Sequence, residues 1–146
     1  MMLGLFFDIE NNVILNPVLQ DPIGFGRSSS NFIKLEKGWT LAELAEAIME
    51  GLSISQKNNL EEAKGEKFWT RATGIKGYAA FSKRYRHILI ECVEEKDYYI
   101  VSAYKRCKDG SYGIDADEVE AREKNYSGFP SIETIAEQVM EALQRV

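Results

Sequence analysis

Apolar residues recur along this chain with two different periods, which separate helical segments from strands. Near the start, the apolar runs Leu3–Phe7 and Val13–Leu15 enclose the polar stretch 8–12, which predicts a β-hairpin. Residues 21–31 are rich in Gly, Pro and Ser and predict a loop, and a short strand is expected after it at Phe32–Leu35. The first part of the chain is therefore expected to be β-structure.

Two segments carry apolar residues at helical spacing. Before the first, Thr40 and Glu43 form a capping-box pattern, in which each side chain accepts a hydrogen bond from a backbone N–H of the first turn. Ser131 is the expected N-cap of the second. The segment 53–66 has no steady period, so it is a connection or a frayed extension of the first helix. The two apolar stripes comprise Leu41, Leu44, Ala45, Ile48 and Leu52, and Ile132, Ile135, Ala136, Val139, Met140 and Leu143.

Between positions 68 and 114 the alternation of apolar and polar residues has the period of a β-strand. The short connections between these strands, including the hairpin signal Asp109-Gly110, imply an antiparallel meander. We therefore expect an α+β fold in which an antiparallel β-sheet is packed on one face by two main helices, as a two-layer sandwich. The expected strands are Tyr78–Ser82, His87–Val93, Tyr98–Tyr104 and Tyr112–Ile114.

The composition is that of a single globular domain spanning residues 1–146. Of the 146 residues, 45% are hydrophobic and 28% are charged, which argues against a disordered or fibrous chain. No apolar run approaches the roughly 18 residues of a membrane span, and no basic residue precedes the apolar start. We therefore expect a cytoplasmic protein without a membrane partner, whose Cys92 and Cys107 are reduced thiols.

Candidate catalytic groups are sparse. His87 is the only histidine, which excludes a Ser-His-Asp triad and a multi-histidine metal site. Cys92 is an odd number of positions away on the same expected strand, so it points to the opposite sheet face. The segment Phe6–Glu10 resembles the opening motif of DnaQ-like 3'-5' exonucleases, whose paired acids hold metal ions, but the later acidic motifs have no counterpart here. We expect a polar turn at Asp8 and Glu10, and a protein that is not an enzyme and has no metal or cofactor.

Charge is unevenly distributed along the chain. The net charge is -5 and the pI is about 5.0, the opposite of the basic excess that nucleic-acid binders usually carry. Between Lys64 and Arg86 there are seven basic residues against one acid, whereas between Asp109 and Glu123 there are six acids against one base. An acidic protein of this kind is suited to a basic protein partner, and direct binding of nucleic acid is not expected.

One alternative use of the basic segment stays open. Residues 64–86 interleave basic side chains with Phe68, Trp69, Tyr78, Phe81 and Tyr85, a mixture that can stack on the bases of single-stranded nucleic acid. The segment would then belong to a nucleic-acid-binding accessory protein. Aromatic residues in a strand-rich segment are more often part of the core, and we favour that interpretation.

The blocks Trp39–Ser55, Phe68–Lys76 and Phe81–Lys83, with the strands after them, resemble the CdiI immunity proteins of contact-dependent growth inhibition systems. The resemblance covers roughly residues 30–105. It implies a cytoplasmic antitoxin that binds and neutralises the C-terminal toxin domain of a cognate effector delivered by a neighbouring bacterium, commonly a nuclease. The family has no shared catalytic or binding residues to transfer to this chain.

The charge pattern indicates which residues would meet such a toxin. A nuclease, whether RNase or DNase, needs a basic surface for its substrate, and an acidic partner can occupy that surface. Tyr98, Tyr112 and Tyr126 are candidate aromatic anchors within such an interface. The predicted toxin-binding residues are Glu94, Glu95, Asp97, Asp109, Tyr112, Asp115, Asp117, Glu118, Glu120 and Glu123.

Overall fold

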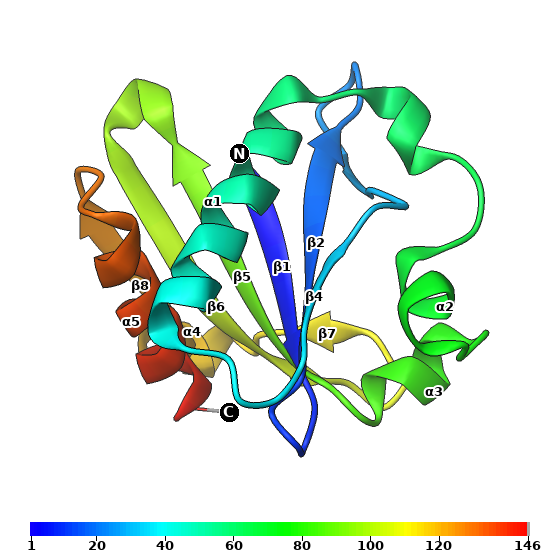
Figure 1. Ribbon diagram of the computed structural model, residues 1–146. Helices are drawn as coiled ribbons and strands as arrows, with labels where there is room; N and C mark the ends of the chain where they lie inside the picture. The colour runs from blue at the N-terminus through cyan, green and yellow to red at the C-terminus, as the bar shows by residue number, and fades with distance from the viewer. Residues whose placement is uncertain (146) are drawn as a thin grey trace.

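An antiparallel sheet forms the centre of the molecule, and the N-terminal strand lies in its middle (Figure 1). The computed structural model describes residues 1–145, except for the side chain of Glu94. The strands follow the order β3-β2-β1-β5-β6-β7, with β4 also paired to β2 and β8 to β6. They are β1 (Met2–Phe7), β2 (Val13–Gln20), β3 (Gly26–Ser28), β4 (Ile33–Leu35), β5 (Arg86–Val93), β6 (Tyr98–Arg106), β7 (Tyr112–Gly113) and β8 (Glu123–Ser127).

Two long helices cover one face of this sheet, and shorter helices pack against part of the other face (Figure 1). The long helices α1 and α5 lie side by side. The helices are α1 (Leu41–Lys57), α2 (Phe68–Thr73), α3 (Tyr78–Ser82), α4 (Val119–Arg122) and α5 (Ile132–Leu143), with 3-10 turns η1 (Leu60–Ala63), η2 (Glu94–Lys96) and η3 (Ala116–Glu118).

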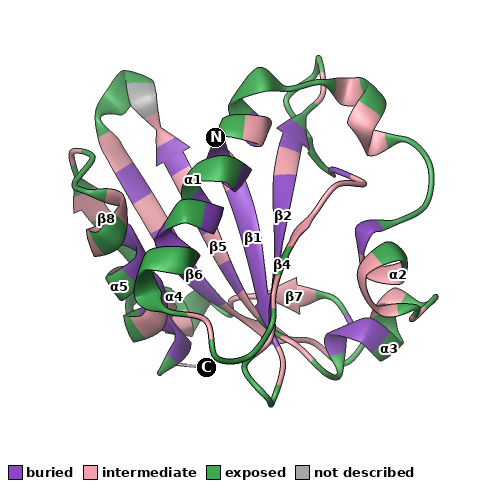
Figure 2. Ribbon diagram, in the orientation of Figure 1, coloured by how far each residue is buried: buried purple, intermediate pink, exposed green. Residues whose placement is uncertain are grey.

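Alternation along β1 divides the core in two. Leu3, Leu5 and Phe7 face α1 and α5 and are fully buried in the larger apolar cluster. Phe6 points to the opposite face, where Phe68 of α2 and Phe81 of α3 close a second cluster over it. Figure 2 shows the resulting concentration of buried positions along the central strands. The sheet is therefore buried on both faces near β1.

The predicted N-terminal caps of the two long helices are confirmed by their hydrogen bonds. Thr40 Oγ1 accepts from the N–H of Glu43 at 3.2 Å, and Glu43 Oε1 accepts from the N–H of Thr40 at 3.2 Å. Ser131 Oγ accepts from the N–H of Thr134 at 3.4 Å. The first helix continues to Lys57 and ends at Asn58, whose φ of 52° is left-handed. Part of the segment 53–66 is thus a true extension of α1.

The expected fold class is confirmed, because an antiparallel sheet carries two main helices on one face. The prediction of a strand at Tyr78–Ser82 is wrong, since these residues form α3, and Phe68–Thr73 forms α2 rather than β-structure. The reason lies in the spacing of the aromatic residues. Tyr78 and Phe81 are three positions apart, which places them on one side of α3 facing the second cluster, and Tyr85 follows beyond the end of the helix.

Two short strands arise where none was predicted. β3 lies within the expected loop 21–31, and β8 is a polar edge strand whose register places Tyr126 beside Tyr99. Neither has an apolar pattern strong enough to mark it in the sequence. None of the helices among the described residues is both long and apolar enough to cross a membrane.

Candidate protein-binding surfaces

Four of the predicted acids lie together on η3, its N-cap residue and α4, and are called the acidic corner below: Asp115, Asp117, Glu118 and Glu120. Lys105 of β6 forms ion pairs with Asp115 and, at 3.0 Å, with Glu118. These bonds raise the pKa of Lys105 to about 12 and lower the pKa of Glu118. The corner is therefore held in place by a cation from the sheet.

The carboxylates of the acidic corner differ in whether a cation already pairs with them. Glu118 also accepts a hydrogen bond from Arg122, so Asp115 and Glu118 are partly neutralised. Asp117 and Glu120 are exposed and form no ion pair with any residue that the structure describes. The side-chain oxygens of Asp115, Asp117 and Glu118 lie within 4.8 Å of one another. Since the Lys105 ammonium already binds two of these three carboxylates, the group functions as an ion-pair network.

A second group of predicted acids lies in the turn between β5 and β6. Glu95 and Asp97 are exposed there, and the backbone carbonyl of Asp97 accepts from the N–H of Gly128 at 2.7 Å. The side chain of Glu94 lies outside the described part of the chain. The nine residues of β6 separate this turn from the acidic corner, a distance of about 30 Å along the strand. Most of the predicted acids thus lie in two separate groups.

Three other predicted residues have structural contacts of their own. Asp109 Oδ1 accepts from the N–H and the hydroxyl of Ser111, and these bonds lower the pKa of Asp109. The Tyr112 hydroxyl donates to the backbone carbonyl of Tyr85 at 2.7 Å, and burial raises the pKa of Tyr112 well above its usual range. Glu123 begins β8 and is half-buried. The predicted anchor Tyr112 is therefore committed to the fold.

The remaining aromatic candidates lie beside the β5–β6 turn. Tyr98 is half-buried at the start of β6. Tyr126 stacks on Tyr99 with ring centroids 5.1 Å apart, and Phe129 also stacks on Tyr99 at 6.4 Å. Phe129 is itself exposed. This edge therefore offers aromatic surface next to Glu95 and Asp97.

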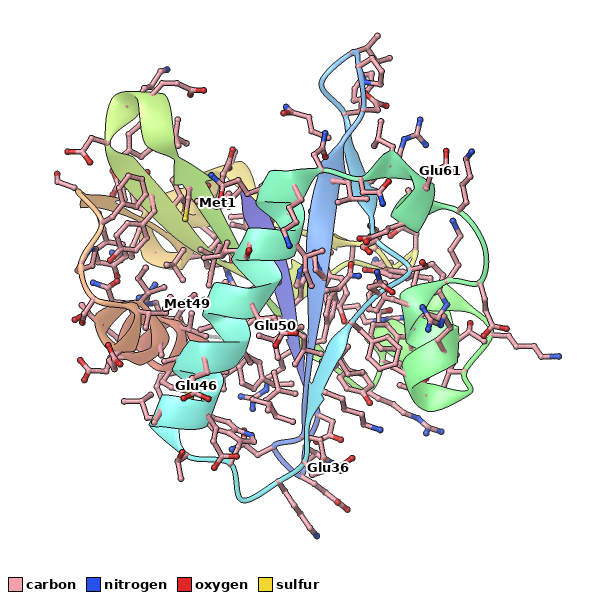
Figure 3. The ribbon with its side chains drawn as sticks, turned by 45° about the horizontal axis from the view of Figure 1, so that its top comes forward. Met1, Glu36, Glu46, Met49, Glu50 and Glu61 are labelled. Carbon is pink, nitrogen blue, oxygen red and sulfur yellow. The ribbon has the colours of Figure 1, made fainter. Side chains whose placement is uncertain are left out.

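A further acidic surface, the helical face, was missed by the sequence reasoning. Figure 3 shows Glu46, Met49 and Glu50 on the outer side of α1, where Met49 is 56% exposed. Within the described residues neither glutamate forms an ion pair. The glutamates outside the two apolar stripes were the available signal, but only the structure shows that α1 and α5 lie side by side. Exposed Glu133, Glu137 and Glu141 of α5 complete this face.

The aromatic residues of the basic segment gather in the second apolar cluster, where Phe68 and Phe81 are buried and Trp69, Tyr78 and Tyr85 are partly buried against them. Phe6 lies 5.2 Å from Phe68 and 5.3 Å from Phe81, measured between ring centroids. Trp69 packs edge-on against Tyr78 at 4.8 Å, and its indole N–H donates to the carbonyl of Lys76. These rings are engaged with one another and are not arranged as a stacking platform for bases.

Asp8 and Glu10 have separate roles in the β1–β2 turn. Asp8 Oδ1 accepts from the N–H groups of Glu10 and Asn12, both at 2.9 Å, and Oδ2 accepts from the Asn12 side chain. Glu10 instead pairs with Lys37 at 3.7 Å. The Asp8 carboxylate is therefore used to shape the turn, which agrees with the polar-turn interpretation.

His87 is enclosed rather than presented to a substrate. Both of its ring nitrogens are buried and have no hydrogen-bond partner among the described residues. Burial lowers the pKa of His87 to about 3, so the imidazole is neutral. Cys92 lies in the cluster on the opposite face of the sheet, as its spacing from His87 predicted, and the two cysteines form no disulfide.

No family model matches the sequence, and no curated protein matches it. Among solved structures, the chain is similar to one in the CdiA-CT/CdiI toxin and immunity complex from Yersinia pseudotuberculosis, with a TM-score of 0.70 at 13% identity. The match covers 99% of this chain and 95% of the other. This chain has the fold of a component of a toxin and immunity complex.

A protein of unknown function from Neisseria meningitidis has a similar structure, with a TM-score of 0.69 at 15% identity. The match covers 99% of this chain and 93% of the other. The resemblance to the toxin and immunity system is thus confirmed as a likeness of fold. It extends beyond residues 30–105 to nearly the whole chain.

Proposed function

We propose that this protein is an immunity protein, which acts in the cytoplasm by binding and neutralising the C-terminal toxin domain of a cognate contact-dependent growth inhibition effector. The observation that carries the proposal is the likeness of fold, over 99% of the chain, to a component of a toxin and immunity complex. The proposed activity of the toxin is that of a nuclease, with a basic substrate-binding surface.

The arrangement of polar groups favours the inhibitor over the toxin of such a pair. General acid–base catalysis requires a titratable group within reach of the substrate. The only histidine, His87, is neutral and its ring nitrogens are buried. Asp8 is occupied by its own turn, and the carboxylates of Asp115 and Glu118 are bound to Lys105. We therefore propose that the protein is not an enzyme.

Within this proposal, the acidic corner is the contact surface for the toxin. Asp117 and Glu120 are its exposed, unpaired charges, and exposed Val119 between them adds apolar surface. The ion pairs of Lys105 fix the corner before binding, so little conformational entropy is lost in forming the complex. Complementary charge at such a surface raises the association rate and selects against partners of the wrong sign.

The function is tested by protection of cells. The C-terminal region of a large secreted effector encoded next to this protein is expressed from an inducible promoter, with or without this chain. Growth of the co-expressing cells and co-purification of the two proteins support the proposal. Growth arrest at equal expression, with no complex recovered, would refute it. An effector region from an unrelated system is the control, because protection should be specific.

The contact surface is mapped with matched charge reversals. Asp117→Lys with Glu120→Lys changes the acidic corner, and Glu46→Lys with Glu50→Lys makes the same charge change on the helical face. All four side chains are exposed, so both variants should fold. We expect the corner variant to associate at least about tenfold more slowly with the toxin region at low salt. If only the helical-face variant is slowed, the toxin binds over α1 and α5 instead.

A further inference from the structure

The tip of the β1–β2 turn exposes a large aliphatic side chain. Ile9 is 99% exposed, although its neighbours Phe6 and Phe7 are buried. A single exposed apolar residue on a surface is ordinary. Ile9 is distinguished by the rigidity of the turn that carries it and by the grooves beside it.

The turn is fixed from both sides. Besides the bonds to the Asp8 carboxylate, Asn12 Oδ1 accepts from the N–H of Lys37 at 2.7 Å, and the carbonyl of Asn11 accepts from the indole N–H of Trp39 at 2.6 Å. These contacts tie the turn to the segment leading into α1. Ile9 is therefore held in one position, and a partner that contacts it need not order the turn.

Two adjoining grooves, of about 570 and 390 Å³, lie beside Ile9. Both are lined by Ile9, Lys83, Arg84 and Tyr85. We call this surface the basic groove. Its larger part is also lined by Asp8, Glu10, Lys34, Ala72, Thr73 and Ile75, and its smaller part by Phe7 and Arg86.

The electrostatic character of the basic groove is opposite to that of the whole protein. Lys83, Arg84 and Arg86 form no ion pair with any described residue. The two acids at its edge are engaged, because Asp8 shapes the turn and Glu10 pairs with Lys37. The lining thus keeps an excess of positive charge, with Lys34, Lys83, Arg84 and Arg86 against the carboxylates of Asp8 and Glu10, on a chain whose net charge is -5.

Tyr85 adds a hydrogen-bond donor to this surface. Burial, together with the negative charge of Asp8, raises the pKa of Tyr85, so its hydroxyl stays protonated. No described residue accepts from that hydroxyl, while the Tyr85 carbonyl is used by Tyr112. The groove therefore combines cations, one hydroxyl donor and apolar surface.

We propose that the basic groove binds an acidic segment of a second partner protein, a segment that also carries an apolar side chain to pack against Ile9. A protein segment matches the groove better than a nucleic acid does, because Phe68 and Phe81 are buried and Trp69 and Tyr78 pack partly buried against them, which leaves little free ring surface for bases. A basic toxin surface would be repelled here, so this contact is independent of the proposed toxin contact.

The test is an unbiased selection from a library of random displayed peptides. It is run in parallel on the unaltered protein and on a variant combining Ile9→Asp, Lys83→Glu and Arg84→Glu. All three residues are exposed, so the variant should keep its fold, which circular dichroism checks. We expect peptides enriched in Asp and Glu, each with an apolar residue, that are recovered only on the unaltered protein.

The recovered peptides are then titrated by fluorescence anisotropy. Ile9→Asp alone should weaken their binding at least about tenfold, because it places a negative charge opposite the acidic segment. Ile23→Asp is the matched control, since Ile23 is 77% exposed on a turn held by Asp21. The Ile23→Asp variant should bind the recovered peptides as tightly as the unaltered protein does.

Three results would overturn the proposal. The first is the absence of any enriched peptide, and the second is enrichment without an excess of acidic residues or without loss on the variant. The third is obtained with a single-stranded RNA oligonucleotide as probe. If this RNA binds the unaltered protein and binding is lost with Lys83→Glu and Arg84→Glu, while no acidic peptide is recovered, the surface is a nucleic-acid contact. These outcomes leave the toxin-protection result untouched, so the two proposals fail separately.

Discussion

Phe6 of β1 and His87 of β5 are directly opposed in register, and their rings stack with centroids 4.2 Å apart. Tyr104 and Tyr112 close the surroundings of the imidazole at 5.2 and 4.9 Å between ring centroids. A charged imidazolium in this apolar site would have no described partner for either N–H group. The fold therefore selects the neutral form of His87.

This relationship predicts a pH-dependent stability. The pKa of His87 falls from 6.5 in the unfolded chain to about 3 in the fold, so between these values only the unfolded state binds the proton. Above about pH 6.5 His87 is neutral in both states, so the stability that the fold gains from a neutral His87 is fully present. It is lost as the pH falls toward 3, by up to about 1.4 kcal/mol per pH unit.

The variant His87→Phe isolates this effect from the titration of carboxylates. Urea unfolding of both proteins at pH 7.5, 5.5 and 4.5 should show that the unaltered protein loses more stability than the variant on acidification. At pH 7.5 the variant should be of similar or greater stability, since two unsatisfied nitrogens are removed. Equal pH dependence in the two proteins would contradict the burial of a neutral imidazole.

The contact of α1 with the sheet depends on Gly51. A Cβ at this position would lie 2.5 Å from Leu3 Cδ1, and Leu3 is fully buried. Gly51→Ala should therefore destabilise the protein by up to about 2 kcal/mol, because the cost of overpacking, about 1–3 kcal/mol, outweighs the gain of about 1 kcal/mol in helix propensity. Ser53→Ala, at an exposed position of the same helix, is the control. Chemical denaturation should separate the two, and stabilisation by Gly51→Ala would disprove this close approach.

Gly110 permits the β6–β7 hairpin to approach α3. Its φ is 90°, and a Cβ would lie 2.7 Å from Ala79 Cβ and 2.8 Å from Ala79 Cα. Gly128 has a φ of 71°, and a Cβ added there would meet no atom within 4 Å, so this position reports backbone strain alone. Gly110→Ala should lower the melting temperature clearly more than Gly128→Ala. Equal shifts would mean that the hairpin does not pack on Ala79.

The ion pairs of Lys105 are expected to order the acidic corner rather than the whole fold. Lys105→Gln should leave the melting temperature nearly unchanged, because exposed ion pairs add little to global stability. Amide hydrogen exchange across residues 115–122 should become several-fold faster, since Asp115 and Glu118 lose their shared partner. Lys108→Gln, at an exposed residue without a described ion pair, should have no effect. Unchanged exchange in Lys105→Gln would show that other contacts order the corner.

Much of the architecture followed from local signals in the sequence. The capping box of Thr40 and Glu43 and the N-cap Ser131 were predicted because they depend on residues three positions apart. The hairpin at Gly110 was also predicted from adjacent residues, because Asp109-Gly110 is typical of a tight turn in which the glycine adopts a positive φ. The errors came from α2 and α3, whose five or six residues are too short for a helical period to be distinguished from alternation.

The candidate surfaces were less predictable, because they depend on distant pairings. The sequence showed an acidic stretch from Asp109 to Glu123 but not that Lys105 and Arg122 neutralise part of it. Likewise, the exposure of Ile9 results from a turn that is held by Trp39 and Lys37, far along the chain. Charge along the sequence therefore indicated the kind of partner, whereas tertiary contacts determine which charges are available to it.

The proposed immunity function is tested by calorimetric titration of this protein with the C-terminal toxin region of its cognate effector. We expect a one-to-one complex with a Kd in the nanomolar range, or about -12 kcal/mol, and loss of toxin activity at the same stoichiometry. Absence of binding at micromolar concentrations, with toxin activity undiminished, would contradict it.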